Sequence, residues 1–175
     1  MEEERSRFEQ LCLPYLDAAY TLARMIVGRD HDAQDVVQEA YFRALKGFKG
    51  LRGDNARPWL MMIVRNTAYS WLKKHANEAN IIPFDPAIHS TSPDQPRAEF
   101  SDEERIRQLH EALSRLPTES REILALREIE GWSYEQLASA LKVPLGTVMS
   151  RLSRARQRLR QEFAGVRHTE CQDEL

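Results

Sequence analysis

Residues 133–160 read SYEQLASALKVPLGTVMSRLSRARQRLR, two helix-like segments on either side of a short break. Ser133 precedes the first segment and Gln136 follows three positions later, which is the spacing of a capping box. Pro144 ends this segment, because proline lacks a backbone N–H and disfavours helical geometry in the residue before it. In the second segment, apolar residues recur at helical spacing at Val148, Leu152, Ala155 and Leu159. The stretch therefore predicts a helix-turn-helix whose longer helix comes last.

The second helix of this motif is rich in arginine. Between Lys142 and Arg160 the sequence contains basic residues and no Asp or Glu. A solvated helix face that complements the helix dipole could carry the same charge, so charge alone leaves two interpretations open. The turn spacing and the small residues that precede the arginines favour binding to DNA.

Length and composition indicate a small regulatory protein. The chain has 175 residues, 42% of them hydrophobic, and a formal net charge of −2, which suits one domain or two small ones. No apolar run approaches the roughly 20 residues that span a bilayer, and the Glu-rich start lacks the order of a signal peptide. We therefore expect a cytoplasmic protein without membrane insertion.

The sequence contains no pattern typical of a metal site or an active site. Cys12 and Cys171 lie near opposite ends, without a CxxC or Cys/His cluster, and the five histidines are scattered. We expect no metal, no cofactor, no catalytic residue and no enzymatic activity. Cys12 falls in an apolar helix and is predicted to be a core residue, while Cys171 is predicted to be a free thiol. Their spacing gives no argument for a redox pair, although that role stays open.

Two helical blocks flank a segment rich in proline. Residues 76–100 include Pro83, Pro86, Pro93 and Pro96 and keep neither helical nor strand periodicity. The composition predicts a flexible linker between domains that move independently. We predict an all-α fold of two small helical domains, residues 1–75 and 101–163, followed by a polar tail at residues 164–175. The helix-turn-helix lies in the C-terminal domain.

The N-terminal block contains three predicted helices. The first keeps helical spacing from Phe8 to Gly28, and the second has an inward stripe of small and apolar residues from Ala33 to Ala44. The outward face of this second helix carries Asp35, Gln38, Glu39, Phe42 and Arg43. Such a charged face is typical of any surface helix and does not by itself predict binding.

The third helix, at residues 57–75, has two stripes. One is apolar, and we assign Trp59 and Trp71 to the core beside it. The other combines cations, an amide and a phenol at Arg65, Asn66, Tyr69 and Lys73, a mixture that suits melted nucleic acid. The preceding loop, residues 46–55, is basic and rich in glycine but lacks the GKS or GKT ending of a P-loop. A loop that closes over an extruded base is the better interpretation.

The C-terminal block begins with two further predicted helices. Residues 102–116 form the first, with an inward stripe at Ile106, Leu109 and Leu113. Pro117 opens the second, in which Ile123, Leu126 and Ile129 point inward before Gly131 ends it. Together with the helix-turn-helix they form a four-helix unit.

These segments in this order resemble an extracytoplasmic-function sigma factor of bacterial RNA polymerase. The resemblance rests on DAQDVVQEAYFRAL, FKGLRGDNARPWL, MMIVRNTAYSWLKK and LPTESREILALREIEGWSYEQLASALKVPLGTVMSRLSRARQRLR, and it covers roughly residues 8–161. It implies a transcription initiation factor in which residues 1–75 form a region 2-like domain and residues 101–163 a region 4-like domain. The implied partners are core RNA polymerase, promoter DNA and an anti-sigma factor, and the implied context is a stress response.

The resemblance also implies a set of functional residues. The polymerase-binding residues are Asp35, Gln38, Glu39 and Arg43. The residues that recognise and melt the minus-10 element are Leu51, Arg52, Asp54, Asn55, Arg65, Asn66, Tyr69 and Lys73. The residues that read the minus-35 element as duplex are Thr147, Ser150, Arg151, Ser153, Arg154 and Arg158.

Two residues depart from the family pattern. Lys142 stands where the family often has a turn glycine, which costs about 1 kcal/mol if that residue needs a positive φ. Met149 takes a position in the reading helix that is commonly basic or polar, so we expect a shifted minus-35 preference.

Two other functions remain open at this stage. A stand-alone repressor or activator could use the same helix-turn-helix, but it usually needs a dimer surface, and the sequence contains no unused apolar helix for one. A sigma mimic that only sequesters an anti-sigma factor would not need the uninterrupted basic run on the last helix. Binding to a promoter that depends on polymerase distinguishes a sigma factor from both.

Overall fold

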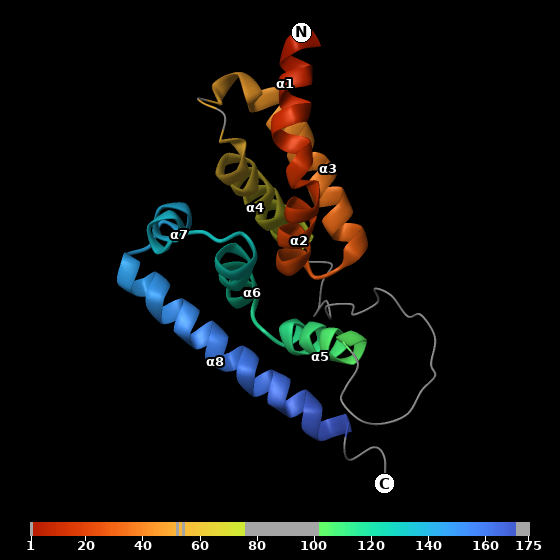
Figure 1. The fold of residues 1–175 in the computed structure, drawn as a ribbon, viewed down its shortest axis with the longest axis vertical. Coiled ribbons are helices and arrows are strands. Elements are labelled where there is room, and N and C mark those ends of the chain that lie inside the picture. The colour runs from red at the N-terminus through yellow and green to blue at the C-terminus, as the bar shows by residue number, and fades with distance from the viewer. Residues whose placement is uncertain (1, 52, 54, 76–101, 171–175) are drawn as a thin grey trace.

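The computed structural model describes residues 2–51, 53, 55–75 and 102–170, and within these ranges all regular structure is helical (Figure 1). The prediction of an all-α fold with two helical domains is confirmed for this part of the chain. The predicted linker at residues 76–100 and the last five residues of the predicted tail lie outside the described residues.

The N-terminal domain is a small bundle. Its elements are α1 (Glu2–Cys12), the 3-10 turn η1 (Leu13–Tyr15), α2 (Leu16–Val27), α3 (Asp30–Gly47), the 3-10 turn η2 (Phe48–Gly50) and α4 (Ala56–His75). α2, α3 and α4 pack against one another, and α1 packs on α4. The helix predicted up to Gly28 is divided in two, because Pro14 cannot donate a backbone hydrogen bond and lies in the 3-10 turn that separates α1 from α2.

Small side chains line the centre of this bundle. On α3 the residues Ala33, Val36, Ala40 and Ala44 are buried, as the inward stripe predicts. Cys12 is also fully buried, which confirms its assignment to the core, and burial raises the pKa of its thiol to about 11. The thiol therefore remains protonated and poorly reactive in the folded protein.

The C-terminal domain is assembled along its last helix. It comprises α5 (Asp102–Ser114), α6 (Thr118–Leu124), the π turn η3 (Ala125–Ile129), α7 (Tyr134–Leu141) and α8 (Leu145–Glu170). α5, α6 and α7 each pack on α8, which runs beside all three (Figure 1). α8 continues to Glu170, so residues 164–170, which the sequence analysis places in a polar tail, are helical.

The predicted helix-turn-helix is present, and its first helix begins with the predicted cap. Ser133 Oγ accepts a hydrogen bond from the Gln136 backbone N–H at 3.1 Å, and Gln136 Oε1 accepts one from the Ser133 N–H at 2.7 Å. This reciprocal pair is the capping box expected at the start of α7. Lys142 ends α7 with a φ of 54°, in the left-handed region. Val148, Leu152 and Ala155 are buried, as the apolar stripe of α8 predicts.

Three apolar residues predicted to point inward are instead exposed. The exposed fractions of Ile106, Leu109 and Ile129 are 53%, 40% and 48%. α5 packs on α8, and its buried face contains Gln108 and Ala112 rather than the first two of these residues. Ile129 lies in the π turn, whose wider winding shifts it out of the stripe that Ile123 and Leu126 begin.

The two domains lie against each other. α6 and η3 pack on α2, and one cluster of buried residues extends across both domains. The domains therefore contact each other in this structure, and charged side chains lie at the contact, as described below. That the linker lets the domains move independently stays a prediction.

Candidate nucleic-acid interface

The exposed face of α8 carries the residues predicted to read duplex DNA. Ser150, Arg151, Ser153, Arg154 and Arg158 are exposed, and Thr147 is half-buried. Burial of the opposite face, at Val148, Leu152 and Ala155, fixes which side chains point outward. Among the described residues, no carboxylate forms an ion pair with any of the three arginines of this set. Arg154 Nε donates only to the Ser150 backbone oxygen, at 3.2 Å.

Arg156 has a different environment from these arginines. Its Nη2 lies 2.6 Å from Oε1 of Glu128 on η3, within the same domain. The hydrogen bond to Glu128 raises the pKa of the Arg156 guanidinium. The ion pair directs this side chain toward η3. Arg156 therefore differs from the three arginines of the predicted DNA-reading set, which form no ion pair among the described residues.

The residues predicted for polymerase binding form one exposed face of α3. Asp35, Gln38, Glu39 and Arg43 are all exposed. Arg43 Nε lies 2.7 Å from Glu39 Oε1, an i, i+4 pair in which both side chains are half-exposed. Such a pair contributes only a few tenths of a kcal/mol to the helix, so both groups are available to a partner.

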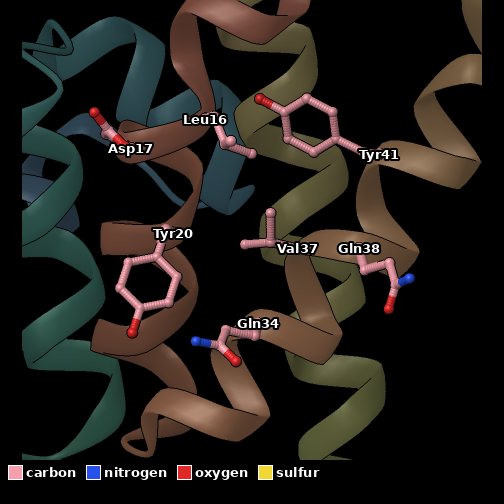
Figure 2. Close-up of a pocket in the computed structure, with 7 residues that line it drawn as sticks. All are labelled: Leu16, Asp17, Tyr20, Gln34, Val37, Gln38 and Tyr41. Atoms are coloured by element: carbon pink, nitrogen blue, oxygen red, sulfur yellow. The ribbon is translucent and has the colours of Figure 1, made fainter.

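A shallow apolar pocket adjoins this face. It lies between α2 and α3 and is lined by Leu16, Asp17, Tyr20, Gln34, Val37, Gln38 and Tyr41 (Figure 2). Leu16 is 45% exposed and lies beside the Tyr41 ring. The Tyr41 hydroxyl donates to the Cys12 carbonyl oxygen at 2.9 Å, and burial raises its pKa. Gln38 belongs both to the pocket and to the predicted polymerase face, so the two surfaces are continuous.

The glycine-rich loop is anchored on an aromatic cluster. Phe48 is buried, with its ring centroid 5.3 Å from that of Phe8 and 6.3 Å from that of Trp59. Arg7 Nη2 donates to the Gly53 carbonyl oxygen at 3.3 Å, and Gly53 has a φ of 83°. Of the four loop residues predicted to contact the minus-10 element, Leu51 is half-buried and Asn55 is exposed, while Arg52 and Asp54 lie outside the described residues.

The predicted polar stripe on α4 is divided. Asn66 and Lys73 are exposed, but Arg65 and Tyr69 are partly buried against Glu122 of α6. Arg65 Nε forms an ion pair with Oε1 of Glu122, and the Tyr69 hydroxyl donates to Oε2 of the same carboxylate at 2.6 Å. Burial, together with the charge of Glu122, raises the pKa of Tyr69. The structure therefore does not bring the four residues together on one open surface.

Both tryptophans near this stripe contact the core. Trp59 packs on Phe48, and Trp71 stacks on His75 with ring centroids 4.0 Å apart. Both rings are half-buried and pack against the core, so they lie at its edge rather than within it as predicted.

The sequence analysis missed a set of charged residues at the contact between the domains. Arg57 Nε on α4 pairs with Glu130 Oε2 at 2.9 Å. Arg121 Nε on α6 donates to the Met25 carbonyl oxygen of α2 at 2.7 Å. Arg121 and Glu122 directly precede Ile123 in an apolar stretch, and both are buried. The sequence did contain a signal for this contact: two charged residues directly precede Ile123, which is predicted to point inward. Charges that are buried with such a residue require partners.

A metal site and a membrane-spanning helix were both sought among the described residues. No cluster of three or more His, Cys, Asp or Glu side chains there is arranged to hold a metal ion. No helix among them is long and apolar enough to cross a bilayer.

Both domains match known protein families. Residues 11–78 match the family described as Sigma-70 region 2, and residues 106–159 match Sigma-70, region 4. The chain is 34% identical to the RNA polymerase sigma-H factor of Pseudomonas aeruginosa over 165 residues, covering 88% of this chain and 84% of that protein. It is 32% identical to the ECF RNA polymerase sigma-E factor of Haemophilus influenzae, covering 88% and 86%. It spans 62% of the length of SigE from Mycolicibacterium smegmatis, at 31% identity and with 90% of this chain covered.

Solved structures agree with this match. The sigma factor RpoE from Bartonella quintana, crystallised with the anti-sigma factor NepR, superposes with a TM-score of 0.74 at 30% identity, covering 90% of this chain and 96% of that one. CnrH, in complex with the cytosolic domain of CnrY, shares the fold with a TM-score of 0.63 at 23% identity, covering 90% and 88%. From the two family matches, in this order and over most of the chain, together with the identity to curated ECF sigma factors, it follows that the protein belongs to the extracytoplasmic-function (ECF) sigma factors of the sigma-70 family.

Proposed function

We propose that this chain directs core RNA polymerase to specific promoters and starts transcription there, in the cytoplasm and under the control of an anti-sigma factor. The observation that carries this proposal is the unpaired arginine face of α8 on a helix-turn-helix, in a chain with both sigma regions. The chain supplies specificity, and the chemistry of RNA synthesis belongs to the polymerase.

For the minus-35 element, the proposed reading face comprises Thr147, Ser150, Arg151, Ser153, Arg154 and Arg158. Arg154 is exposed and held only by its own helix, so its guanidinium is free to meet a guanine edge in the major groove. A good bidentate contact contributes about 1–3 kcal/mol of discrimination. Because Glu128 holds Arg156, we assign Arg156 to the structure of the domain rather than to base reading.

For polymerase docking, the proposed surface is the outer face of α3 at Asp35, Gln38, Glu39 and Arg43. The apolar pocket at Leu16, Val37 and Tyr41 extends this surface. Interfaces commonly combine an apolar centre with a polar rim, which is the arrangement here.

For the minus-10 element, the proposed contacts come from the loop at Leu51, Arg52, Asp54 and Asn55 and from the α4 stripe at Arg65, Asn66, Tyr69 and Lys73. The anchored glycine-rich loop supports the role of accepting a flipped base. An anti-sigma partner is proposed because the related RpoE was crystallised with one.

Reconstitution with core RNA polymerase tests this function. The purified chain is added to core enzyme, and transcription starts are mapped across the genomic DNA of its host. Starts that share two upstream elements are expected. Absence of specific starts from a folded protein would contradict the proposal, and sequence-specific DNA binding without polymerase would indicate a repressor.

A further inference from the structure

We infer that Glu122 is an autoinhibitory latch: in the free chain it covers Arg65 and Tyr69, two residues proposed to face the melted DNA strand, and so couples promoter opening to separation of the domains. The inference rests on the proposed function, because it needs α4 to be a strand-facing surface. It concerns the chain alone and requires no anti-sigma factor.

One carboxylate, that of Glu122, contacts both groups. Oε1 of Glu122 pairs with Arg65 Nε, and Oε2 accepts the Tyr69 hydroxyl hydrogen at 2.6 Å. Arg65 also lies over the Tyr69 ring, 4.8 Å from its centroid. A cation and an aromatic face are the two features with which a protein holds single-stranded DNA. The Glu122 carboxylate carries the same negative charge as a DNA phosphate. It therefore competes with the phosphate for Arg65 and Tyr69.

The contact between Glu122 and Arg65 is largely buried. The side chain of Glu122 is 3% exposed, and that of Arg65 is 21% exposed. Screening by solvent is weak at such a site, so the attraction between the two charges is larger than in a surface ion pair, while the desolvation of both charges offsets part of it. Removal of one partner leaves a buried charge uncompensated, which makes the contact sensitive to a single substitution.

Two further contacts close the same junction. Arg121, next to Glu122 on α6, donates to the Met25 carbonyl oxygen near the C-terminal end of α2, where a cation is favoured by the helix dipole. Glu130 after η3 pairs with Arg57 at the start of α4. Adjacent residues on α6 thus reach two different helices of the N-terminal domain, and Glu130 adds an attachment farther along α4.

One feature favours reopening. Oε1 of Glu130 is buried and has no hydrogen-bond partner among the described residues. An unsatisfied buried carboxylate oxygen costs free energy that is recovered when the domains separate and water reaches it. The closed arrangement therefore contains a cost that separation of the domains relieves.

Masking of this kind lowers the apparent affinity for DNA. If only a fraction of molecules is open, the apparent dissociation constant rises by the inverse of that fraction. A substitution that opens the chain should therefore tighten binding without any new contact to DNA.

The test uses the full-length free chain and three variants. Glu122→Gln removes the latch charge, and Glu130→Gln weakens the junction while leaving Arg65 and Tyr69 intact. Glu128→Gln is the matched control, because Glu128 pairs with Arg156 inside the C-terminal domain and the change in net charge is the same. Small-angle X-ray scattering reports the radius of gyration. Fluorescence anisotropy reports binding to a short single-stranded oligonucleotide of random sequence.

We expect Glu122→Gln and Glu130→Gln to enlarge the radius of gyration and to tighten oligonucleotide binding by about fivefold, with Glu128→Gln unchanged in both. An unchanged radius in both junction variants would overturn the latch. A larger radius with unchanged oligonucleotide affinity would overturn the masking, since α4 would then not be a strand surface. Circular dichroism checks folding, and if Glu122→Gln unfolds, Glu130→Gln carries both readouts. Start-site mapping with core polymerase tests the proposed function separately, so the two failures are distinguishable.

Discussion

The Tyr69 hydroxyl donates to Oε2 of Glu122 at 2.6 Å, joining residues 53 positions apart in the sequence and on opposite sides of the domain junction. Burial and the negative charge of Glu122 raise the pKa of Tyr69, so its hydroxyl remains a hydrogen-bond donor across the physiological pH range. The bond links α4, which the sequence assigns to nucleic acid, to α6 of the neighbouring domain. The arrangement of the two domains therefore decides whether this part of α4 is free to contact DNA.

Tyr69→Phe should reveal the strength of this bond. The substitution keeps the ring and removes the hydroxyl, which leaves one oxygen of a buried carboxylate without its donor. We expect the free energy of unfolding to fall by about 1.5–3 kcal/mol, measured by urea denaturation. Tyr15→Phe is the control, because the Tyr15 ring contacts Arg57 but its loss of a hydroxyl should cost less than about 0.5 kcal/mol. Equal losses in the two variants would contradict the importance of the Glu122 bond.

Arg154→Ala should weaken transcription from a promoter that depends on its minus-35 element. Loss of one bidentate base contact of about 1–3 kcal/mol corresponds to a reduction of about fivefold to more than a hundredfold, with binding to core polymerase unchanged. The measurement is multi-round transcription in vitro alongside a core-binding titration. Arg156→Ala serves as the control, since Glu128 holds that guanidinium. Undiminished output from Arg154→Ala would show that the base-reading residue lies elsewhere.

Glu39→Arg should impair docking to core polymerase. The substitution reverses one charge on the outer face of α3 and places it beside Arg43, so we expect about tenfold weaker binding by fluorescence anisotropy. Glu9→Arg is a matched control, because Glu9 also forms an exposed i, i+4 pair, with Arg5, but on α1. Equal affinities of the Glu39 and Glu9 variants would mean that the docking face is wrongly placed.

Lys142→Gly should stabilise the protein. Lys142 has a φ of 54° at the end of α7, where a side chain is strained and glycine is not. Part of the gain is offset by the greater freedom of glycine in the unfolded chain, which leaves about 0.5–1 kcal/mol in urea denaturation. Lys142→Val should instead destabilise, because a β-branched residue tolerates this region poorly. A loss of stability in the glycine variant would contradict the strain.

His110 should make stability depend on pH. Burial lowers its pKa below the ordinary histidine value of 6.5, and the charge of Arg24 lowers it further, while Asp30 opposes the shift. The unfolded chain therefore binds this proton at a higher pH than the folded chain, so the stabilisation is present above pH 6.5 and is lost as pH falls through the folded pKa. Urea denaturation between about pH 7 and pH 5 should show a shallower slope for His110→Gln than for the parent. Identical slopes would exclude His110 as a contributor.

Much of the fold could be predicted because its causes are local. Helical periodicity marks the buried stripes of α3 and α8, and the Ser133 and Gln136 pair marks the start of α7. The errors also have local causes. Pro14 divides a helix whose periodicity looks continuous, and the π turn moves Ile129 to the surface although its spacing matches an inward stripe.

The sequence by itself determined most of the helices, the cap of α7, the apolar faces of α3 and α8 and the exposed arginines of α8, because each depends on residues within a few turns of one another. Only the tertiary structure decided that Arg65 and Tyr69 meet Glu122 and that Arg57 meets Glu130. These partners lie on helices of different domains, and the periodicity of one helix carries no information about which distant carboxylate will neutralise its charge. Burial then makes each contact sensitive to the loss of either partner, since charges removed from water must find partners.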